Sequence, residues 1–159
     1  MPELSSYLLS ALAIAAALFC LWLLSLRLRD ASIVDIFWGL GFVLVGWLSV
    51  ALAPGPTLPR RLLLAGLVTL WGARLSGYLA WRNLGKGEDY RYQAMRRRMG
   101  ARFPVVSLFT VFWLQGVLLW IISWPLRAGI EASAPAGLTM LDGAGAVVFL
   151  VGLGCESLG

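Results

Sequence analysis

The sequence contains no histidine, which removes Ser-His-Asp triads, histidine-activated cysteine nucleophiles and every metal site built on imidazole ligands. Cysteine is nearly absent as well: Cys20 and Cys155 lie far apart in apolar stretches and form no C-x-x-C pair. We therefore expect no metal centre and treat both cysteines as packing residues. Charged residues make up only 13% of the 159, about half the share of a soluble domain. With so little charge and so much apolar content, a disordered chain is excluded.

What the sequence has in abundance is apolar side chains, at 60% of residues, with a mean hydropathy of +0.82. These values indicate an integral membrane protein. The net charge of +5 is a balance often found in nucleic-acid-binding proteins. Membrane proteins also collect Lys and Arg in their cytoplasmic loops. We therefore expect membrane lipids rather than nucleic acid as partners.

Five apolar segments are each long enough to cross a bilayer core about 30 Å thick at about 1.5 Å per residue. The predicted spans are residues 5–26, 33–53, 62–81, 103–124 and 138–158. Ser32 is placed to cap the second span, and Pro125 to close the fourth. The sequence predicts an all-α fold, a polytopic transmembrane helical bundle of about five spans, forming a single domain over residues 1–159.

The segment 82–102, between the third and fourth spans, holds seven of the 13 basic residues. This segment and the turn after the first span lie on the same side of the membrane and together hold nine Lys and Arg, whereas the other side holds three. Because an excess of Lys and Arg faces the cytoplasm, we expect segment 82–102 to be cytoplasmic and the N-terminus to lie outside. A short helix is expected in its middle, ended by Gly100. Tyr92, Met95 and Met99 would share one face of this helix, which we expect to rest on the membrane interface.

Charges inside a span are costly and therefore mark candidate functional residues. Asp35, Arg74, Asp142 and Glu156 lie within the predicted spans. The carboxylates lie in first or last turns, where capping or headgroup contact is an equally simple reading. Arg74 lies deeper, and we expect it to attract an anion or to pair with an acid such as Asp35. Gln115, in mid-span, either forms an interhelical hydrogen bond or lines a cavity.

Residues 82–92 gather cations, an amide, two glycines and two tyrosines at the membrane surface. Their cations suit the binding of phosphates, although an ordinary basic loop in contact with lipid phosphates is an open alternative. The run lacks both the G-x-G-x-x-G and the Walker patterns. By spacing alone it remains a weak motif.

Several motifs closely resemble one bacterial family, the steroid 5-alpha-reductase-like membrane proteins classed as a domain of unknown function. The most specific motif is the Arg82-Asn83-x-Gly85-Lys86-Gly87-Glu88-Asp89-x-Arg91-Tyr92 run. The others are Trp71-Gly-Ala-Arg74-Leu75, the stretch from Ser107 to Gln115-Gly116, Asp35-x-x-Trp38-Gly39, and Gly152-x-Gly154-x-Glu156-x-x-Gly159. The resemblance covers nearly the whole chain.

The resemblance implies NADPH-dependent reduction of a carbon–carbon double bond conjugated to a carbonyl, in an apolar, lipid-like steroid, sterol or isoprenoid substrate. In the characterised steroid reductases an acid of the second span and a tyrosine of the third donate to the carbonyl oxygen. Asp35, protonated, and Tyr78 are the matching candidates here, since Trp71 stands where that tyrosine is expected. Trp38, Trp71 and Gln115 would line the substrate pocket. Cofactor contacts are assigned to Arg74, Arg82, Asn83, Lys86, Glu88, Asp89, Arg91 and Tyr92.

In the family, the chain continues after the position of Gly159 with further spans that supply much of the cofactor site. The resemblance thus implies that residues 1–159 are the N-terminal part of a larger bundle in a bacterial inner membrane. This part alone would not turn over NADPH. Two alternatives stay open. A related fold serves membrane methyltransferases that use S-adenosylmethionine. A non-enzymatic protein that scaffolds a partner or binds anionic lipid through residues 82–102 would also carry this basic segment.

Overall fold

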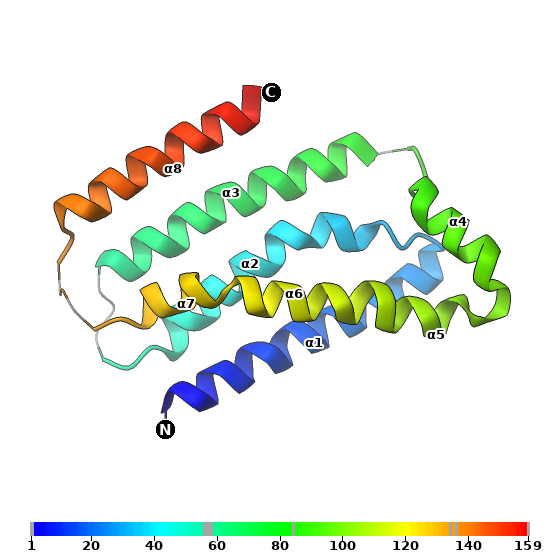
Figure 1. Ribbon diagram of the computed structural model, residues 1–159, viewed down its shortest axis with the longest axis horizontal. Coiled ribbons are helices and arrows are strands. Elements are labelled where there is room, and N and C mark those ends of the chain that lie inside the picture. The colour runs from blue at the N-terminus through cyan, green and yellow to red at the C-terminus, as the bar shows by residue number, and fades with distance from the viewer. Residues whose placement is uncertain (1, 56–58, 84, 134, 136, 159) are drawn as a thin grey trace.

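The computed structural model describes residues 2–55, 59–83, 85–133, 135 and 137–158, and every regular element among them is helical (Figure 1). This confirms the predicted all-α fold. The elements are α1 (Pro2–Leu28), α2 (Ile33–Leu52), α3 (Pro59–Asn83), α4 (Tyr90–Met99), the 3₁₀ turn η1 (Gly100–Arg102), α5 (Phe103–Ser107), the π-helical stretch η2 (Leu108–Trp113), α6 (Leu114–Ile122), α7 (Trp124–Glu131) and α8 (Met140–Leu158).

Five helical stretches are long and apolar enough to cross a membrane, as the sequence predicts. They are α1, α2, α3, the helical stretch Tyr90–Ile122, which includes α4 to α6, and α8. α3 has 25 residues and is therefore about 37 Å long, more than the hydrocarbon core requires. Its last turns thus extend toward the connector that holds α4, which lies across one end of the bundle (Figure 1).

α2 and α3 form the tightest helix pair, and two glycines make it possible. A Cβ atom added at Gly39 would lie 2.5 Å from the carbonyl oxygen of Gly72, and one at Gly72 would lie 2.5 Å from that of Gly39. The two backbones are thus in direct contact at this crossing. Because the helices are antiparallel, this contact sets Asp35 opposite residue 76. Asp35 and Arg74 therefore differ in height by only about 3 Å.

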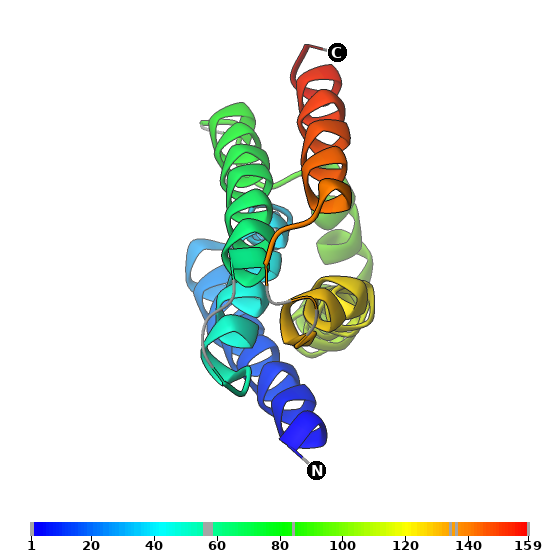
Figure 2. The same ribbon diagram turned by 90° about the vertical axis from the view of Figure 1, so that its left-hand side faces the viewer.

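Arg74 pairs with an acid, as expected, but that acid is Glu156 of α8 and not Asp35. Its Nη1 lies 2.6 Å from Glu156 Oε1, and its Nη2 donates to the Glu156 carbonyl oxygen at 2.7 Å. The physical reason is the position of each residue around α3. Gly72 faces α2, and Arg74 lies about 200° further around the helix, so it is on the side that faces away from α2 and Asp35. An ion pair of 2.7 Å between Arg60 and Asp142, 14 residues earlier on both helices, holds α8 parallel to α3 (Figure 2).

The fourth span is not one uniform helix. It passes through the π-helical stretch η2, and α6 ends at Ile122. Pro125 was expected to close the span, but α7 begins beside it and continues to Glu131. Proline is tolerated in the first turn of a helix because its missing N–H has no partner there anyway. The chain therefore breaks at the buried Ser123 and resumes in helical form.

The apolar face of α4 rests on the bundle core, so its expected place on the membrane interface was wrong. Tyr92 is 8% exposed and belongs to the core cluster, and Met95 and Met99 pack against that cluster. The reason is the direction of α4, which crosses the end of the bundle and turns its inner face toward the spans (Figure 1). Cys20 and Cys155 are exposed rather than packed in the core.

Candidate functional site

The candidate site lies at the end of the bundle where the α1–α2 turn meets the connector between α3 and α5. Two backbone amides join these segments: Ala31 donates to Glu88 Oε1 at 2.9 Å, and Asp89 donates to Ser32 Oγ at 3.0 Å. Ser32 does occupy the N-cap position of α2, but its hydroxyl does not cap that helix. It accepts from the connector instead, which fixes the start of α4 against the start of α2.

Glu88 is the centre of this junction, with only 7% of its side chain exposed. Arg96 donates to both carboxylate oxygens, at 3.0 Å from Nε to Oε2 and 2.8 Å from Nη2 to Oε1. The Arg96 guanidinium also lies 4.1 Å from the centre of the Phe103 ring. Burial raises the pKa of Glu88, but the hydrogen bonds from Arg96 and Ala31 outweigh it and leave that pKa below its ordinary value.

Asp35 accepts hydrogen bonds at both of its oxygens. Tyr92 Oη donates to Oδ1 at 3.0 Å, and Arg91 Nη2 donates to Oδ2 at 3.0 Å. The Asp35 side chain is 21% exposed, so the pair lies at the edge of the core rather than deep within it. The resemblance leads one to expect a protonated, donating Asp35, whereas this arrangement makes it the acceptor of a tyrosine hydroxyl and a guanidinium.

Asp89 aligns these donors by capping α4. Its Oδ1 accepts from the backbone N–H and from Nε of Arg91, both at 3.0 Å. The hydrogen bonds from Arg91 hold the pKa of Asp89 below its ordinary value. Arg91 therefore bridges Asp89 and Asp35, and it fixes the first turn of α4, where Tyr92 lies.

A polar cavity of about 280 Å³ opens beside this junction. Its lining is Asn83, Lys86, Gly87, Glu88, Asp89, Tyr90 and Gln93. Gly87 has a φ of 69°, a left-handed conformation that glycine adopts without strain. The turn lets the exposed Lys86 and the amides of Asn83 and Gln93 border one space. Because Glu88 and Asp89 are already paired with arginines, the remaining charge on this wall is the ammonium of Lys86.

Tyr78 is not brought together with Asp35. It is 48% exposed on α3, with its ring 6.3 Å from that of Trp81 and 5.9 Å from the Arg82 guanidinium. Arg82 itself is exposed and donates from Nε to Asn83 Oδ1 at 3.4 Å. The tyrosine that contacts Asp35 is Tyr92, which sequence reasoning placed among the cofactor contacts.

The expected pocket residues lie elsewhere. Trp38 and Trp71 pack edge-on against Phe42, each with ring centres 5.6 Å apart, and all three belong to the core or pack against it. Gln115 is half-buried on α6, and its side chain has no hydrogen-bond partner within the described part of the chain. None of Trp38, Trp71 and Gln115 lines the polar cavity.

Sequence reasoning missed three participants in this site: Ser32 as an acceptor from the connector, Arg96 as the partner of Glu88, and Gln93 as a lining residue. A signal for Gln93 and Arg96 exists in the spacing. They follow Glu88 by five and eight residues, so a helix beginning near Asp89 returns both toward Glu88. Nothing in the sequence marks Ser32 beyond its place before α2.

These features define a class, the polytopic α-helical membrane proteins, here with a structured polar connector at one end of the bundle. Residues 21–159 match the model of the family described as "Protein of unknown function (DUF1295)", and the chain belongs to this family, which is known as steroid 5-alpha-reductase-like. The match includes α2, α3, α4 and hence every residue of the candidate site. No curated protein and no solved structure matches the chain.

Proposed function

We propose that the protein is a membrane-embedded, NADPH-dependent reductase that acts on the conjugated carbon–carbon double bond of a lipid-like enone. The observation that supports this most is the hydrogen bond between Tyr92 and Asp35, at the edge of the core beside a polar cavity. Membership of a steroid 5-alpha-reductase-like family points the same way. Asp35, Tyr92 and the cavity lie at the end of the bundle that carries most of the basic residues.

The chemistry explains why a tyrosine–carboxylate pair suits this reaction. When a hydride adds to the β-carbon of an enone, negative charge develops on the carbonyl oxygen, and a preorganised donor there lowers the barrier. The Tyr92 hydroxyl would be that donor, turned from Asp35 to the carbonyl oxygen of the bound substrate. In the free enzyme Asp35 would hold the hydroxyl in place by accepting its hydrogen bond, and it would keep the hydrogen bond from Arg91 once the hydroxyl donates to the substrate. The α-carbon would take up a proton from solvent to complete the reduction.

The polar cavity fits a phosphate-bearing part of NADPH, which supplies the hydride when bound. At about 280 Å³ it is smaller than the typical site of a drug-sized ligand, roughly 300–1,000 Å³, so it would hold only part of a dinucleotide. Lys86, Asn83 and Gln93 provide the cation and amides that bind phosphate oxygens. Glu88 and Asp89 are neutralised by their arginines and would not repel the anion.

We further propose that the basic end lies in the cytoplasm of a bacterial cell, with the N-terminus on the other side of the inner membrane. The contacts of Ala31 and Ser32 with the connector support this orientation. They join the two segments whose nine Lys and Arg residues exceed the three at the opposite end, and such an excess faces the cytoplasm. A cytosolic nucleotide would then reach the polar cavity directly.

The test begins with cofactor binding by protein expressed from its complete gene and purified in lipid nanodiscs. We expect NADPH to quench tryptophan fluorescence saturably, and apolar enones to be reduced at its expense. Lys86→Gln should weaken NADPH binding about tenfold, as expected for loss of a charge-assisted hydrogen bond. Arg97→Gln, which removes another exposed cation, on α4, should leave the affinity unchanged.

Other outcomes would overturn the proposal in recognisable ways. Saturable binding of S-adenosylmethionine in place of NADPH would assign the protein to the methyltransferases. Binding to anionic vesicles that weakens with salt, with no dinucleotide bound at all, would favour a lipid-binding scaffold. Equal effects of Lys86→Gln and Arg97→Gln would remove the polar cavity from the cofactor site.

A further inference from the structure

Arg29 has a backbone conformation that arginine rarely adopts. Its φ of 53° is left-handed, and within the described part of the chain every other residue with a positive φ is glycine. The Asp30 N–H donates to the Ser25 carbonyl oxygen at 3.1 Å and so closes the end of α1 around Arg29. Glycine is usual at this position after a helix, because a Cβ atom is strained there. The sequence thus keeps an arginine where glycine would fit better.

The Arg29 side chain makes no contact that explains why it is kept. It is exposed, and among the described residues it has no hydrogen bond, ion pair or ring contact. The neighbouring Asp30 accepts from the backbone N–H of Ser32 instead, at 2.9 Å. Whatever the Arg29 guanidinium binds therefore lies outside the described chain.

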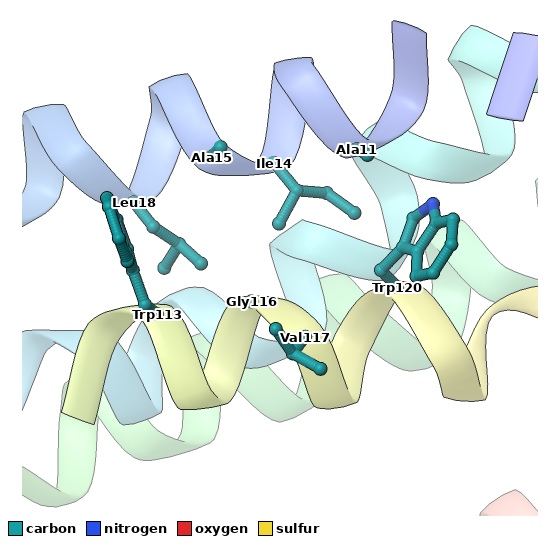
Figure 3. A pocket seen from close by; sticks show the side chains of 8 residues that line it. All are labelled: Ala11, Ile14, Ala15, Leu18, Trp113, Gly116, Val117 and Trp120. Carbon is teal, nitrogen blue, oxygen red and sulfur yellow. The ribbon is translucent and has the colours of Figure 1, made fainter. Parts of the chain in front are cut away.

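The packing of α1 against the fourth span shows which residues share the height of Arg29. The two run antiparallel (Figure 1), and Gly116 lies opposite the part of α1 between Ile14 and Leu18 (Figure 3). A Cβ atom at Gly116 would lie 2.8 Å from Leu18 Cδ1 and 3.5 Å from Ile14 Cγ2. About 13 residues from this level toward the basic end, the two segments reach Arg29 and Phe103.

Two further arginines join Arg29 at this height. The Trp22 indole N–H donates to the Pro104 carbonyl oxygen at 3.0 Å, which ties the last turns of α1 to the start of α5. Arg27 and Arg102 both lie beyond this bond, toward the basic end. Both are exposed and, like Arg29, have no partner in the described part of the chain. We call Arg27, Arg29 and Arg102 the arginine cluster.

The arginine cluster lies where the hydrocarbon of the bilayer ends. Leu28, between Arg27 and Arg29, is 55% exposed, and Val105, three residues after Arg102, is 62% exposed. Large apolar side chains exposed on spanning helices face lipid tails. Cations directly beside them therefore lie at the depth of the lipid phosphates.

The electrostatics of this end favour an anion. Its segments carry a surplus of five positive charges, which is the whole net charge of the protein. The acids there are each held by another residue: Asp30, Asp35, Glu88 and Asp89. Guanidinium groups bind phosphate oxygens through paired hydrogen bonds. A phosphate shared by neighbouring arginines would also remove their mutual repulsion.

We propose that the arginine cluster binds the phosphate of an anionic membrane phospholipid, and that Arg29 keeps its strained conformation because it reaches this phosphate. Strained residues persist where a function requires them, and basic residues at a membrane surface attract anionic headgroups. The depth of the cluster favours a lipid phosphate over a free one. None of the three arginines lines the polar cavity, so the lipid site is independent of the proposed reduction.

The experiment titrates the purified protein, in micelles of a neutral detergent, with phosphatidylglycerol that carries a pyrene on one acyl chain. Energy transfer from tryptophan to pyrene reports binding, and phosphatidylcholine with the same label is the reference. We expect phosphatidylglycerol to bind at least threefold more tightly. Unlabelled phosphatidylglycerol should displace the probe, whereas inorganic phosphate at the same concentration should not. Equal affinity for the two lipids, or displacement by inorganic phosphate, would overturn the proposal.

Arg29→Gly separates a lipid contact from a structural role. Glycine relieves the strained φ, so Tm should be unchanged or higher, while the preference for phosphatidylglycerol should fall at least threefold. Arg97→Gln is the control: Arg97 is exposed at the same end but lies among Gln93, Ala94 and Ala101, which are exposed and polar or small. It should leave the preference unchanged. Equal effects of the two substitutions, or a lower Tm in Arg29→Gly, would contradict the proposal.

Discussion

Glu88 illustrates how one side chain positions the whole candidate site. Its two oxygens accept from Ala31 and from Arg96, so it ties the α1–α2 turn to α4. The resemblance assigned Glu88 to the cofactor, yet its side chain is 7% exposed and both of its oxygens are engaged by the protein. We interpret it as a positioning residue: α4 stays across the bundle end, and Tyr92 stays on Asp35, because Glu88 holds the start of the connector.

Acid should therefore release the connector. The pKa of Glu88 in the fold is lower than its ordinary value of 4.5, so its contribution to stability is complete above that value and is lost as the pH falls through the lower, folded one. Hydrogen exchange should show amides of α4 well protected near neutral pH and losing protection below about pH 4.5. In Glu88→Gln the protection of α4 should be about tenfold lower already at neutral pH, because the neutral amide keeps only one acceptor oxygen and loses the charge that pairs with Arg96.

The matched control is Glu131→Gln at the opposite end, where Glu131 accepts from Ser6 at 3.1 Å and faces Arg127 at 3.7 Å. This variant should loosen α7 and leave α4 unchanged. If Glu88→Gln left α4 as protected as in the unmodified protein, Glu88 would not be what holds the connector.

At the same scale, the sequence singled out Asp35 as a candidate but did not reveal its contact with Tyr92. A carboxylate at the start of an apolar span stands out in any chain, because placing it there is costly. Tyr92 is separated from Asp35 by 57 residues, and only the path of α4 across the bundle end brings them together. The spacing of residues along α4 gives its faces, but not the surface on which each face rests. For the same reason Tyr78, on the expected span, turned out to face away from the core.

At the scale of elements, the α2–α3 pair depends on Gly39 and Gly72. Gly72→Ala would place a methyl group 2.5 Å from the Gly39 carbonyl oxygen and 2.7 Å from Val43 Cγ2, so the helices must move apart. We expect a loss of about 1–3 kcal/mol in unfolding free energy, typical of an overpacked contact. Thermal or denaturant unfolding in detergent micelles would measure it.

Gly66→Ala in the same helix is the control. A Cβ atom there has nothing within 4 Å, and alanine favours the helix over glycine by up to about 1 kcal/mol. This variant should be as stable as the unmodified protein or slightly more so. Equal destabilisation by Gly66→Ala and Gly72→Ala would show that the close contact of α2 and α3 is not what the glycine provides.

The number of spanning helices was predictable because hydropathy alone locates a segment that must lie in lipid. The division of the fourth span into α5, η2, α6 and α7 was not. Pro125 signals a break, but it is equally compatible with the first turn of a new helix, which is where it lies. The apolar pattern of residues 108–113 does not indicate that η2 is π-helical.

At the scale of the whole molecule, the two ends of the bundle should face opposite sides of the membrane. The test replaces Cys20 and Cys155 by alanine and introduces a single cysteine at Ala101, in the connector, or at Gly55, in the α2–α3 turn; both positions are exposed. A membrane-impermeant maleimide added to intact cells should label the cysteine at 55. The cysteine at 101 should react only after the cytoplasmic face is opened. The reverse pattern would invert the proposed orientation.

The proposed activity rests on the tyrosine that meets Asp35, and of the two candidate tyrosines only Tyr92 makes that contact. The most direct measurement is therefore NADPH-dependent enone reduction by Tyr92→Phe and Tyr78→Phe, with kcat and KM determined separately and folding checked by thermal unfolding. Removing a donor that acts in the transition state should lower kcat by about 100-fold or more in Tyr92→Phe. Tyr78→Phe should retain the kcat of the unmodified protein. A folded Tyr92→Phe protein with unchanged kcat would contradict the account, as would a loss confined to Tyr78→Phe.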